Sequence, residues 1–134
     1  MTIKLSKDDL GEFRQLIRAD QHELFADARV DNSSDSAPDP HDLYDASLAA
    51  CKAITLLMYA ERANIPLDDV DIEIARDNTE ERSGTYQLHV DLRLNGNLDE
   101  SHRNRLEKVA EKCPVHKLMT AVTTVVTTSC RLAE

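Results

Sequence analysis

Apolar residues cover nearly every side of one segment of the chain, Pro40 to Asn64. Asp39 is a favourable helix-capping residue, Pro40 suits the first helical position, and Asp42 lies near the positive end of the helix dipole. The pattern therefore predicts a long helix that begins at Pro40 and ends at Asn64. A helix that is apolar on most sides requires burial on most sides, which a small chain rarely supplies alone. We therefore expect an obligate homodimer with this helix near its centre.

The segments on either side of this helix alternate between apolar and polar residues, which is typical of strands. Two hairpins are expected: Glu12–Arg18 with His22–Val30, and Val70–Arg76 with Thr85–Leu94. Leu98–Lys112 has an apolar side and a charged side, which indicates a second helix. The β-branched segment Thr123–Leu132 favours a final strand. The sequence therefore predicts an α+β fold.

Length and charge limit the classes of protein to which the chain can belong. Its 134 residues fit a single domain over residues 1–134. A net charge of −9 argues against nucleic acid and anionic membrane as partners, because both require clustered Lys and Arg. The polar start of the sequence does not resemble a signal peptide, and no uninterrupted apolar stretch is long enough to span a bilayer. We therefore expect a cytoplasmic protein with no membrane partner.

Two of the three cysteines lie in distinctive helical contexts. Cys51 falls within the long apolar helix, whereas Cys113 precedes Pro114 at an expected helix start, where free N–H groups and the dipole favour a thiolate. An apolar helix interior would instead raise the pKa of Cys51 unless a cation is supplied from elsewhere. Local reasoning therefore favours Cys113 as the nucleophile of a two-thiol redox site. Cys130 has no such motif and is expected to serve packing.

The stretch PDPHDLYDASLAACKAITLLMYAERANIPLDDVDIEI, the motif AEKCPVHKLM and the last threonine-rich segment resemble the OsmC and Ohr family of osmotically induced and organic hydroperoxide resistance proteins. The resemblance implies an OsmC-like intertwined homodimer, with antiparallel sheets around a buried central helix and active sites at the subunit interface. It also implies a cysteine-based peroxidase of the antioxidant stress response that acts without metal or other cofactor. The spacing of a structural zinc site is absent from Cys51, His41 and His116.

Carried over by position, the resemblance makes Cys51 the peroxidatic thiol and Cys113 the resolving thiol, which reverses the assignment from local reasoning. An organic hydroperoxide would oxidise Cys51 to a sulfenic acid, Cys113 would condense with it to a disulfide, and a dithiol reductant would reopen that bond. Members of the family hold the thiolate with an arginine that a glutamate at the helix start positions. Arg29 is the best-placed arginine in this sequence.

The chain departs from the family at the glutamate itself. Ten residues before Cys51, where hydroperoxide-reducing members carry glutamate, this sequence has His41, and the nearest carboxylate is Asp42. A protonated histidine could stabilise a thiolate or protonate the leaving alkoxide, but it cannot hold an arginine as a carboxylate does. Two alternatives therefore stay open: a peroxide-responsive thiol protein without turnover, and a dimeric module that binds an apolar small molecule.

Overall fold

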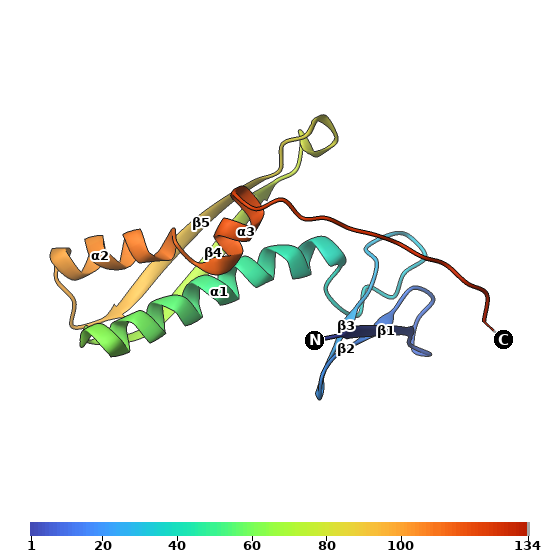
Figure 1. The fold of residues 1–134 in the computed structure, drawn as a ribbon, viewed down its shortest axis with the longest axis horizontal. Helices are drawn as coiled ribbons and strands as arrows, with labels where there is room; N and C mark the ends of the chain where they lie inside the picture. Colours follow the sequence, from blue (N-terminus) through green and yellow to red (C-terminus); the bar gives the residue numbers. More distant parts are fainter. Residues whose placement is uncertain (134) are drawn as a thin grey trace. The chain divides into compact units, whose positions relative to one another are not determined.

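The computed structural model describes residues 1–133 and shows a mixed α+β fold (Figure 1). The regular elements follow one another along the chain as β1 (Ile3–Lys7), β2 (Gln15–Ala19), β3 (His22–Ala26), α1 (Pro40–Ala63), β4 (Leu67–Asp77), a 3-10 turn (Glu81–Ser83), β5 (Gln87–Gly96), α2 (Glu100–Ala110) and α3 (Pro114–Thr120). One sheet has the strand order β1-β2-β3, and β4 pairs with β5 in a second sheet. The predicted fold class is confirmed.

The first predicted hairpin is present, with shorter strands than expected. β2 and β3 pair antiparallel, with Leu16 opposite Phe25, and Asp20 takes a left-handed conformation (φ 56°) in the turn between them. β1 adds a third antiparallel strand that the sequence pattern did not predict. Its apolar residues Ile3 and Leu5 are both exposed in the single chain, so this strand gives no clear pattern of burial.

Helix α1 begins where the sequence predicts. The Asp39 carboxylate accepts the Asp42 N–H at 2.8 Å, and the Asp42 carboxylate accepts the Asp39 N–H at 3.1 Å. This reciprocal capping satisfies two amide groups that a helix N-terminus leaves unpaired. At the other end Asn64 is left-handed, with φ 55°, and stops the helix one residue after its last helical position. The predicted helix is confirmed.

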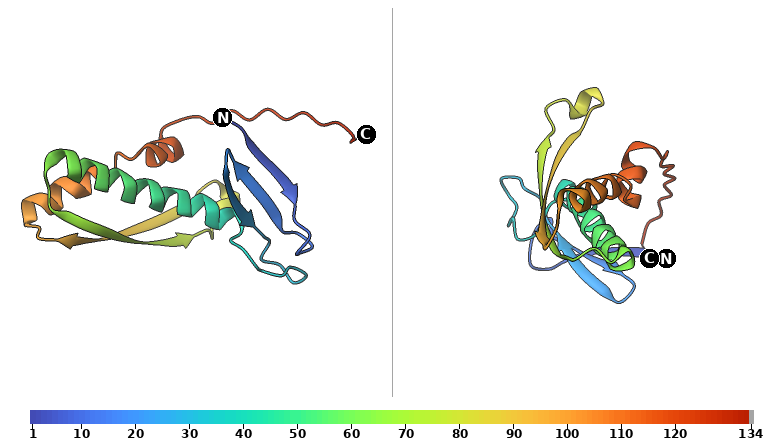
Figure 2. Two further views of the ribbon diagram at one scale, coloured as in Figure 1. Left: turned by 90° about the horizontal axis from the view of Figure 1, so that it is seen from below. Right: turned by 90° about the vertical axis from the view of Figure 1, so that its left-hand side faces the viewer.

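The chain forms two compact units, each with its own type of interior. Unit 1 comprises Met1–Ala49 and Ile74–Val90, and unit 2 comprises Ala50–Glu73 and the chain from Asp91 onward. Within unit 2, the second half of α1 lies beside α2 (Figure 2). Their buried apolar residues form one core: Leu56, Ala60, Ile65, Leu106 and Ala110. This core fixes the part of α1 that carries Cys51.

A glycine at the end of β5 permits a close backbone approach within unit 2. Gly96 has φ 151°, a conformation that side chains disfavour. A Cβ atom at this position would collide with the carbonyl oxygen of Pro66. Gly96 therefore allows the end of the hairpin to pass directly against the segment that leaves α1.

Helix α1 is less buried in the single chain than its apolar composition predicts. One stripe faces the interior: Asp45, Leu48, Lys52, Leu56 and Ala60. Ile54 and Met58 are more than half exposed, at 57% and 56%. By length and composition alone the helix could cross a membrane, with a mean hydropathy of 1.2 in its most apolar window. In the single chain 28% of this window is buried, and the second half of the helix packs against α2.

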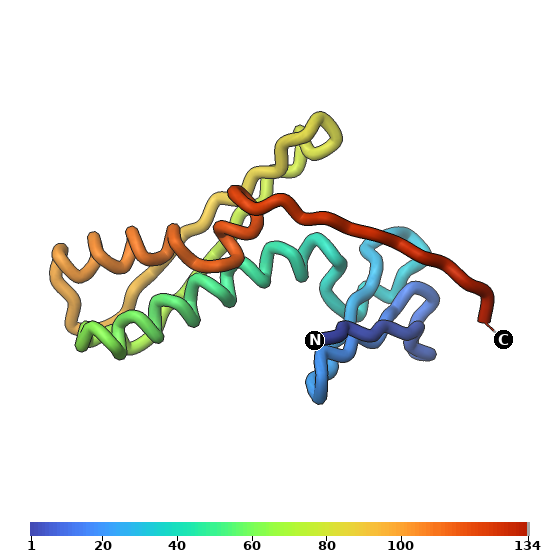
Figure 3. The backbone as a smooth tube through the Cα atoms, viewed as in Figure 1, coloured from blue at the N-terminus to red at the C-terminus, as the bar shows by residue number. Residues whose placement is uncertain are grey.

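The predicted final strand, Thr123–Leu132, is wrong for the single chain. These residues form neither helix nor strand, and they run as an extended segment (Figure 3). β-branched residues favour an extended backbone, but a strand also requires a neighbour for its hydrogen bonds. Within residues 1–133 no other strand pairs with this segment. Val125 and Val126 are about four-fifths exposed as a result, at 81% and 79%.

Candidate functional site

The two thiols of the predicted redox site both belong to unit 2. Cys51 lies on α1, and its Sγ is 4.0 Å from the Thr55 hydroxyl one turn later. Cys113 caps α3, and both cysteines are free thiols. The two side chains are close enough for Cys51 to raise the pKa of Cys113. Folding therefore brings together two cysteines that lie far apart in the sequence.

Cys113 is the helix N-cap that the Cys-Pro pair predicts. Its Sγ accepts the His116 N–H at 3.4 Å, and Pro114 occupies the first helical position of α3. Burial of this fully enclosed thiol raises its pKa, and interaction with Cys51 raises it further. The His116 N–H and the Lys52 charge lower the pKa, but they do not outweigh burial. The expectation that the helix cap lowers the pKa of Cys113 is therefore wrong, because burial raises it.

Accessibility also separates the two cysteines. Cys51 is half-buried, whereas Cys113 has no exposed surface. Cys51 is therefore the more accessible of the two residues in the single chain, whereas Cys113 is enclosed. Cys130 lies in the exposed C-terminal segment, so its expected packing role is not met in the single chain.

Lys52 follows Cys51 and is buried, with only 3% of its surface exposed. A lysine in an apolar helix commonly extends its stem so that the charge reaches water, but Lys52 does not. Its Nζ instead donates to the Ala110 carbonyl at 2.6 Å and lies 2.9 Å from His116 Nδ1. Sequence reasoning missed this role because both contacts are with residues more than fifty positions away.

The arginine and the carboxylate that the sequence singles out meet in unit 1. Arg29 donates to the Asp42 carboxylate at 2.6 Å, and its charge also lies 3.8 Å from Asp39 and Asp35. Asp42 thus holds Arg29, as the family glutamate would hold its arginine. His41 makes no contact with this pair and bonds elsewhere.

Arg76 completes a charge cluster that sequence reasoning did not find. It donates to Asp42 at 2.8 Å and to Asp45 at 2.6 Å. Hydrogen bonds from Arg76 and then Arg29 lower the pKa of Asp42 to about 2. Tyr86 also donates to Asp45, at 2.7 Å, and burial followed by this bond raises the pKa of Tyr86 to about 12. The only sequence signal for Arg76 is a basic residue near the end of an alternating strand.

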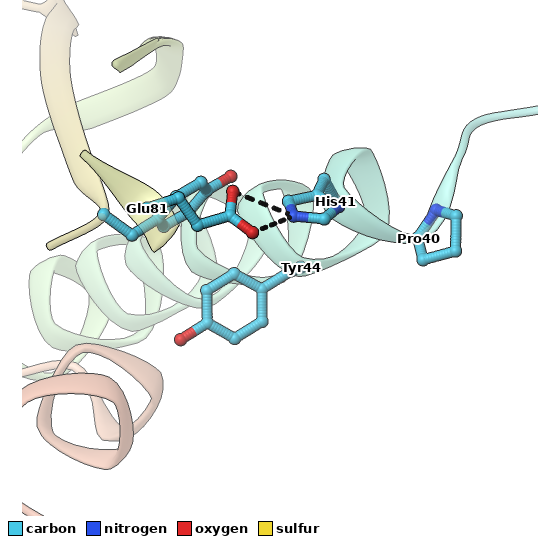
Figure 4. Close-up of a pocket in the computed structure, with 5 residues that line it drawn as sticks. Pro40, His41, Tyr44 and Glu81 are labelled. Atoms are coloured by element: carbon cyan, nitrogen blue, oxygen red, sulfur yellow. Dashed lines mark hydrogen bonds and ion pairs between the residues drawn. The ribbon is translucent and has the colours of Figure 1, made fainter. Parts of the chain in front are cut away.

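His41 lines a cavity of about 380 Å³ in unit 1 (Figure 4). Its Nε2 lies 3.0 Å from the Glu81 carboxylate, which raises the pKa of His41 through a hydrogen bond and its negative charge. The ring of Tyr86 packs edge-on against both His41 and Tyr44, with centroids 5.9 Å apart in each pair. The cavity is therefore lined mainly by aromatic rings, together with the Glu81 carboxylate that contacts His41.

Comparison with known families identifies the fold group of this chain. Residues 33–128 match the family described as OsmC-like protein, and this match spans most of the sequence. The chain belongs to the OsmC-like family. The family resemblance predicted from its cysteine motifs is thereby confirmed. No curated protein matches this OsmC-like chain.

Solved structures of OsmC-like proteins share the fold at low sequence identity. A Psychrobacter arcticus protein, named for osmotic stress induction and detoxification response, is 24% identical, with 87% and 86% of the two chains covered and a TM-score of 0.73. The organic hydroperoxide resistance protein OsmC of Legionella pneumophila is 22% identical, with 90% of each chain covered and a TM-score of 0.60. The organic hydroperoxide resistance protein OhrB of Bacillus subtilis is 26% identical, with 90% and 92% covered and a TM-score of 0.56.

Proposed function

We propose that this OsmC-like protein is a thiol peroxidase that reduces organic hydroperoxides through Cys51 and Cys113. The observation that carries the proposal is the pairing of an accessible thiol with a fully buried one in unit 2. Such a pair suits a mechanism in which one sulfur meets the peroxide and the other meets only its neighbour. The names of the Legionella and Bacillus structures support the same substrate class.

The reaction needs only the two thiols and an external dithiol. The Cys51 thiolate attacks the outer peroxide oxygen, the O–O bond breaks, and the alkoxide takes a proton to leave as an alcohol. Cys51 becomes a sulfenic acid, with which the Cys113 thiol condenses to form a disulfide and water. A dithiol then reduces the disulfide by two electrons. We place this cycle in the cytoplasm, where dithiol reductants are available.

Arg29 and Asp42 are the residues that we propose support the Cys51 thiolate. The ion pair between them provides the fixed arginine that the family resemblance implies. His41 serves another purpose in this proposal, because its bond to Glu81 commits its ring to the aromatic cavity. In this proposal the Asp42 carboxylate takes the place of the family glutamate, whose position is occupied by His41 in this chain.

Stopped-flow measurements with an alkyl hydroperoxide test the reaction directly. The unaltered protein should consume peroxide rapidly with a dithiol present, and Cys51→Ser should abolish this consumption. Cys113→Ser should still react once and then accumulate the Cys51 sulfenic acid. Cys130→Ser is the matched control and should turn over normally. Unchanged peroxide consumption in Cys51→Ser would rule out the proposed chemistry.

We also propose that the working form is a homodimer, with the partner subunit covering the exposed side of α1. Ile54 and Met58 follow Cys51 at spacings of three and seven residues, so all three share one helix face. Leu57 is also exposed, at 40%, next to this face. An exposed apolar face of this kind, bordering the reactive thiol, is suited to a second copy of the chain.

The dimer is tested by sedimentation equilibrium at micromolar protein concentration. The unaltered chain should sediment as a dimer, and Met58→Glu should dissociate it because a carboxylate would be buried in an apolar contact. Lys117→Glu, on an exposed position outside this face, is the matched control. A monomeric unaltered protein would exclude the dimer while leaving the thiol chemistry open.

The cavity beside His41 supports one other function, the binding of an apolar small molecule without redox turnover. Aromatic walls and a single charged pair are typical of small-molecule sites. This alternative predicts that Cys51→Ser retains ligand binding and that peroxide is not consumed catalytically. The stopped-flow assay therefore also decides between the two functions.

A further inference from the structure

Lys52 is an unusual residue in unit 2, because it is a cation buried among neutral partners. Only 3% of its surface is exposed, yet its Nζ contacts a backbone carbonyl and an imidazole nitrogen, not a carboxylate. A buried charge without an opposite charge is costly, since water no longer solvates it. The energetic cost of burying the Lys52 charge suggests that the charge has a function.

His116 connects this cation to the thiol site. Its ring Nδ1 lies 2.9 Å from Lys52 Nζ, and its backbone N–H donates to Cys113 Sγ at 3.4 Å. An ammonium carries only donors, so Nδ1 is the acceptor and the remaining ring proton is on Nε2. The same histidine therefore fixes the direction of the lysine and contacts the Cys113 sulfur.

The positive charge of Lys52 acts on Cys113, the thiol whose ionisation is disfavoured by burial. Its electrostatic attraction lowers the pKa of Cys113, against the larger effect of burial. An ammonium has three protons, and contacts within residues 1–133 account for two of them. Within these residues no hydrogen-bond acceptor is found for the third proton.

We propose that Lys52, oriented by His116, is a positioning residue for disulfide formation: it stabilises the Cys113 thiolate that attacks oxidised Cys51. This inference rests on the proposed peroxidase and assigns separate cations to its two steps. Arg29 serves peroxide reduction at Cys51, and Lys52 serves the resolving step at Cys113.

The step balances without any further reactant. Cys113 loses its thiol proton, and its sulfur attacks the sulfur of the Cys51 sulfenic acid. The Cys51 S–O bond breaks, the S–S bond forms, and the departing hydroxide takes up one proton to leave as water. Lys52 changes neither charge nor bonding overall. It lowers the energy of the state in which Cys113 is an anion.

A purely structural role for Lys52 makes a different prediction. Its bond to the Ala110 carbonyl lies at the end of α2, where a lysine can satisfy a free helix carbonyl. If this were its only role, removing the charge would lower stability but would leave the ratio of the two chemical steps unchanged. The test must therefore measure each step separately.

The first experiment follows both steps after one equivalent of an alkyl hydroperoxide, using the full chain with Cys130→Ser throughout. Dimedone traps the Cys51 sulfenic acid at successive times, and mass spectrometry measures both the trapped form and the Cys51–Cys113 disulfide. Lys52→Met should form sulfenic acid at the normal rate but close the disulfide about tenfold more slowly, equivalent to about 1.4 kcal/mol of transition-state stabilisation. Lys52→Arg should largely restore closure, and Lys117→Met should match the unaltered protein.

A second experiment tests the inference without peroxide, so that it can be judged if the peroxidase proposal fails. An aromatic disulfide reagent converts Cys51 to a mixed disulfide, and Cys113 then displaces the coloured thiolate. Lys52→Met should slow this release about tenfold, with rescue by Lys52→Arg. His116→Gln, which removes the imidazole contact, should slow it to a lesser degree and gives the test if Lys52→Met does not fold.

Equal release rates in the unaltered protein and Lys52→Met would overturn the inference. An equal slowing of sulfenic acid formation and disulfide closure would also overturn it. By contrast, absence of Cys51 oxidation by hydroperoxide in the unaltered protein, together with slow release in Lys52→Met, would reject the peroxidase and retain the role of Lys52.

Discussion

The two units of this chain are stabilised by opposite means. Unit 1 encloses charged groups beside apolar ones: the buried carboxylate of Asp45 meets an arginine and a tyrosine, and the buried carboxylate of Asp27 accepts bonds from two serines. Unit 2 encloses an apolar core in which Leu56 and Leu106 are fully buried. Lys52 is the one buried charge among the residues of unit 2 that the structure describes, and its partners are neutral.

This difference explains where chemistry is expected. In unit 1 the buried carboxylate of Asp45 pairs with Arg76, and the buried carboxylate of Asp27 is stabilised by neutral serine donors, so both serve mainly to hold the structure. In unit 2, Lys52 forms no ion pair with a carboxylate within residues 1–133, so its charge can act on the thiol pair. An uncancelled charge in an apolar interior has a stronger effect than the same charge in water.

The apolar character of unit 2 is tested by Leu106→Ala. This substitution should lower the free energy of unfolding by about 3 kcal/mol, because it leaves a cavity beside Leu56 in the core. Urea unfolding followed by circular dichroism measures the change. Leu118→Ala, at a position that is 51% exposed, is the control and should have little effect. Similar losses in the two variants would show that this core does not dominate unit 2.

The polar character of unit 1 is tested by Arg76→Ala. The variant leaves Asp42 and Asp45 without their shared partner and should lose about 2 kcal/mol of stability, since Asp45 is buried. Arg93→Ala breaks an ion pair to Asp71 that is largely exposed, and should unfold like the unaltered protein. If both arginine variants unfold alike, the cluster contributes no more than a surface ion pair.

Arg29→Met tests whether Arg29 and Lys52 act on different chemical steps. This variant should slow peroxide reduction by about tenfold while disulfide closure proceeds at the normal rate. Stopped-flow and dimedone trapping measure the two steps. Arg18→Met, which removes another arginine engaged in an exposed ion pair, is the control. A normal peroxide rate in Arg29→Met would mean that the thiolate of Cys51 is supported by another group.

The smallest expected effect is a pH dependence confined to unit 1. The pKa of Asp42 is lowered from 3.8 to about 2, so its ion pairs stabilise the fold fully above pH 3.8 and are lost as the pH falls through 2. After discounting for solvent screening, we expect about 1 kcal/mol. The stability difference between the unaltered protein and Asp42→Asn should therefore shrink below pH 3.8 in urea titrations. A difference that is constant with pH would exclude this contribution.

The sequence predicted those features that depend on neighbouring residues. The boundaries of α1 follow from Asp39, Pro40 and Asn64, and the cap at Cys113 follows from the proline after it. The sequence-based predictions were wrong or incomplete for properties that depend on contacts with residues distant in the sequence. Burial outweighs the helix cap at Cys113, and Lys52 is enclosed by residues that follow it by more than fifty positions.

Two strands were also predicted incorrectly. The segment Thr123–Leu132 has the composition of a strand, but composition cannot supply the neighbouring strand that would complete it. β1 was missed although Ile3 and Leu5 alternate with polar residues, and all of its residues are exposed in the single chain.

The contact at Gly96 limits how this protein can be engineered or can evolve. Any larger residue would have to displace the Pro66 backbone, not a movable side chain. Gly84, in the turn before β5, also has a positive φ but has open space around it. A saturation library selected for folded protein should therefore retain only glycine at position 96, while position 84 also admits asparagine, which tolerates left-handed backbone. Loop grafts belong at the open turn, and the glycine beside Pro66 should be left untouched.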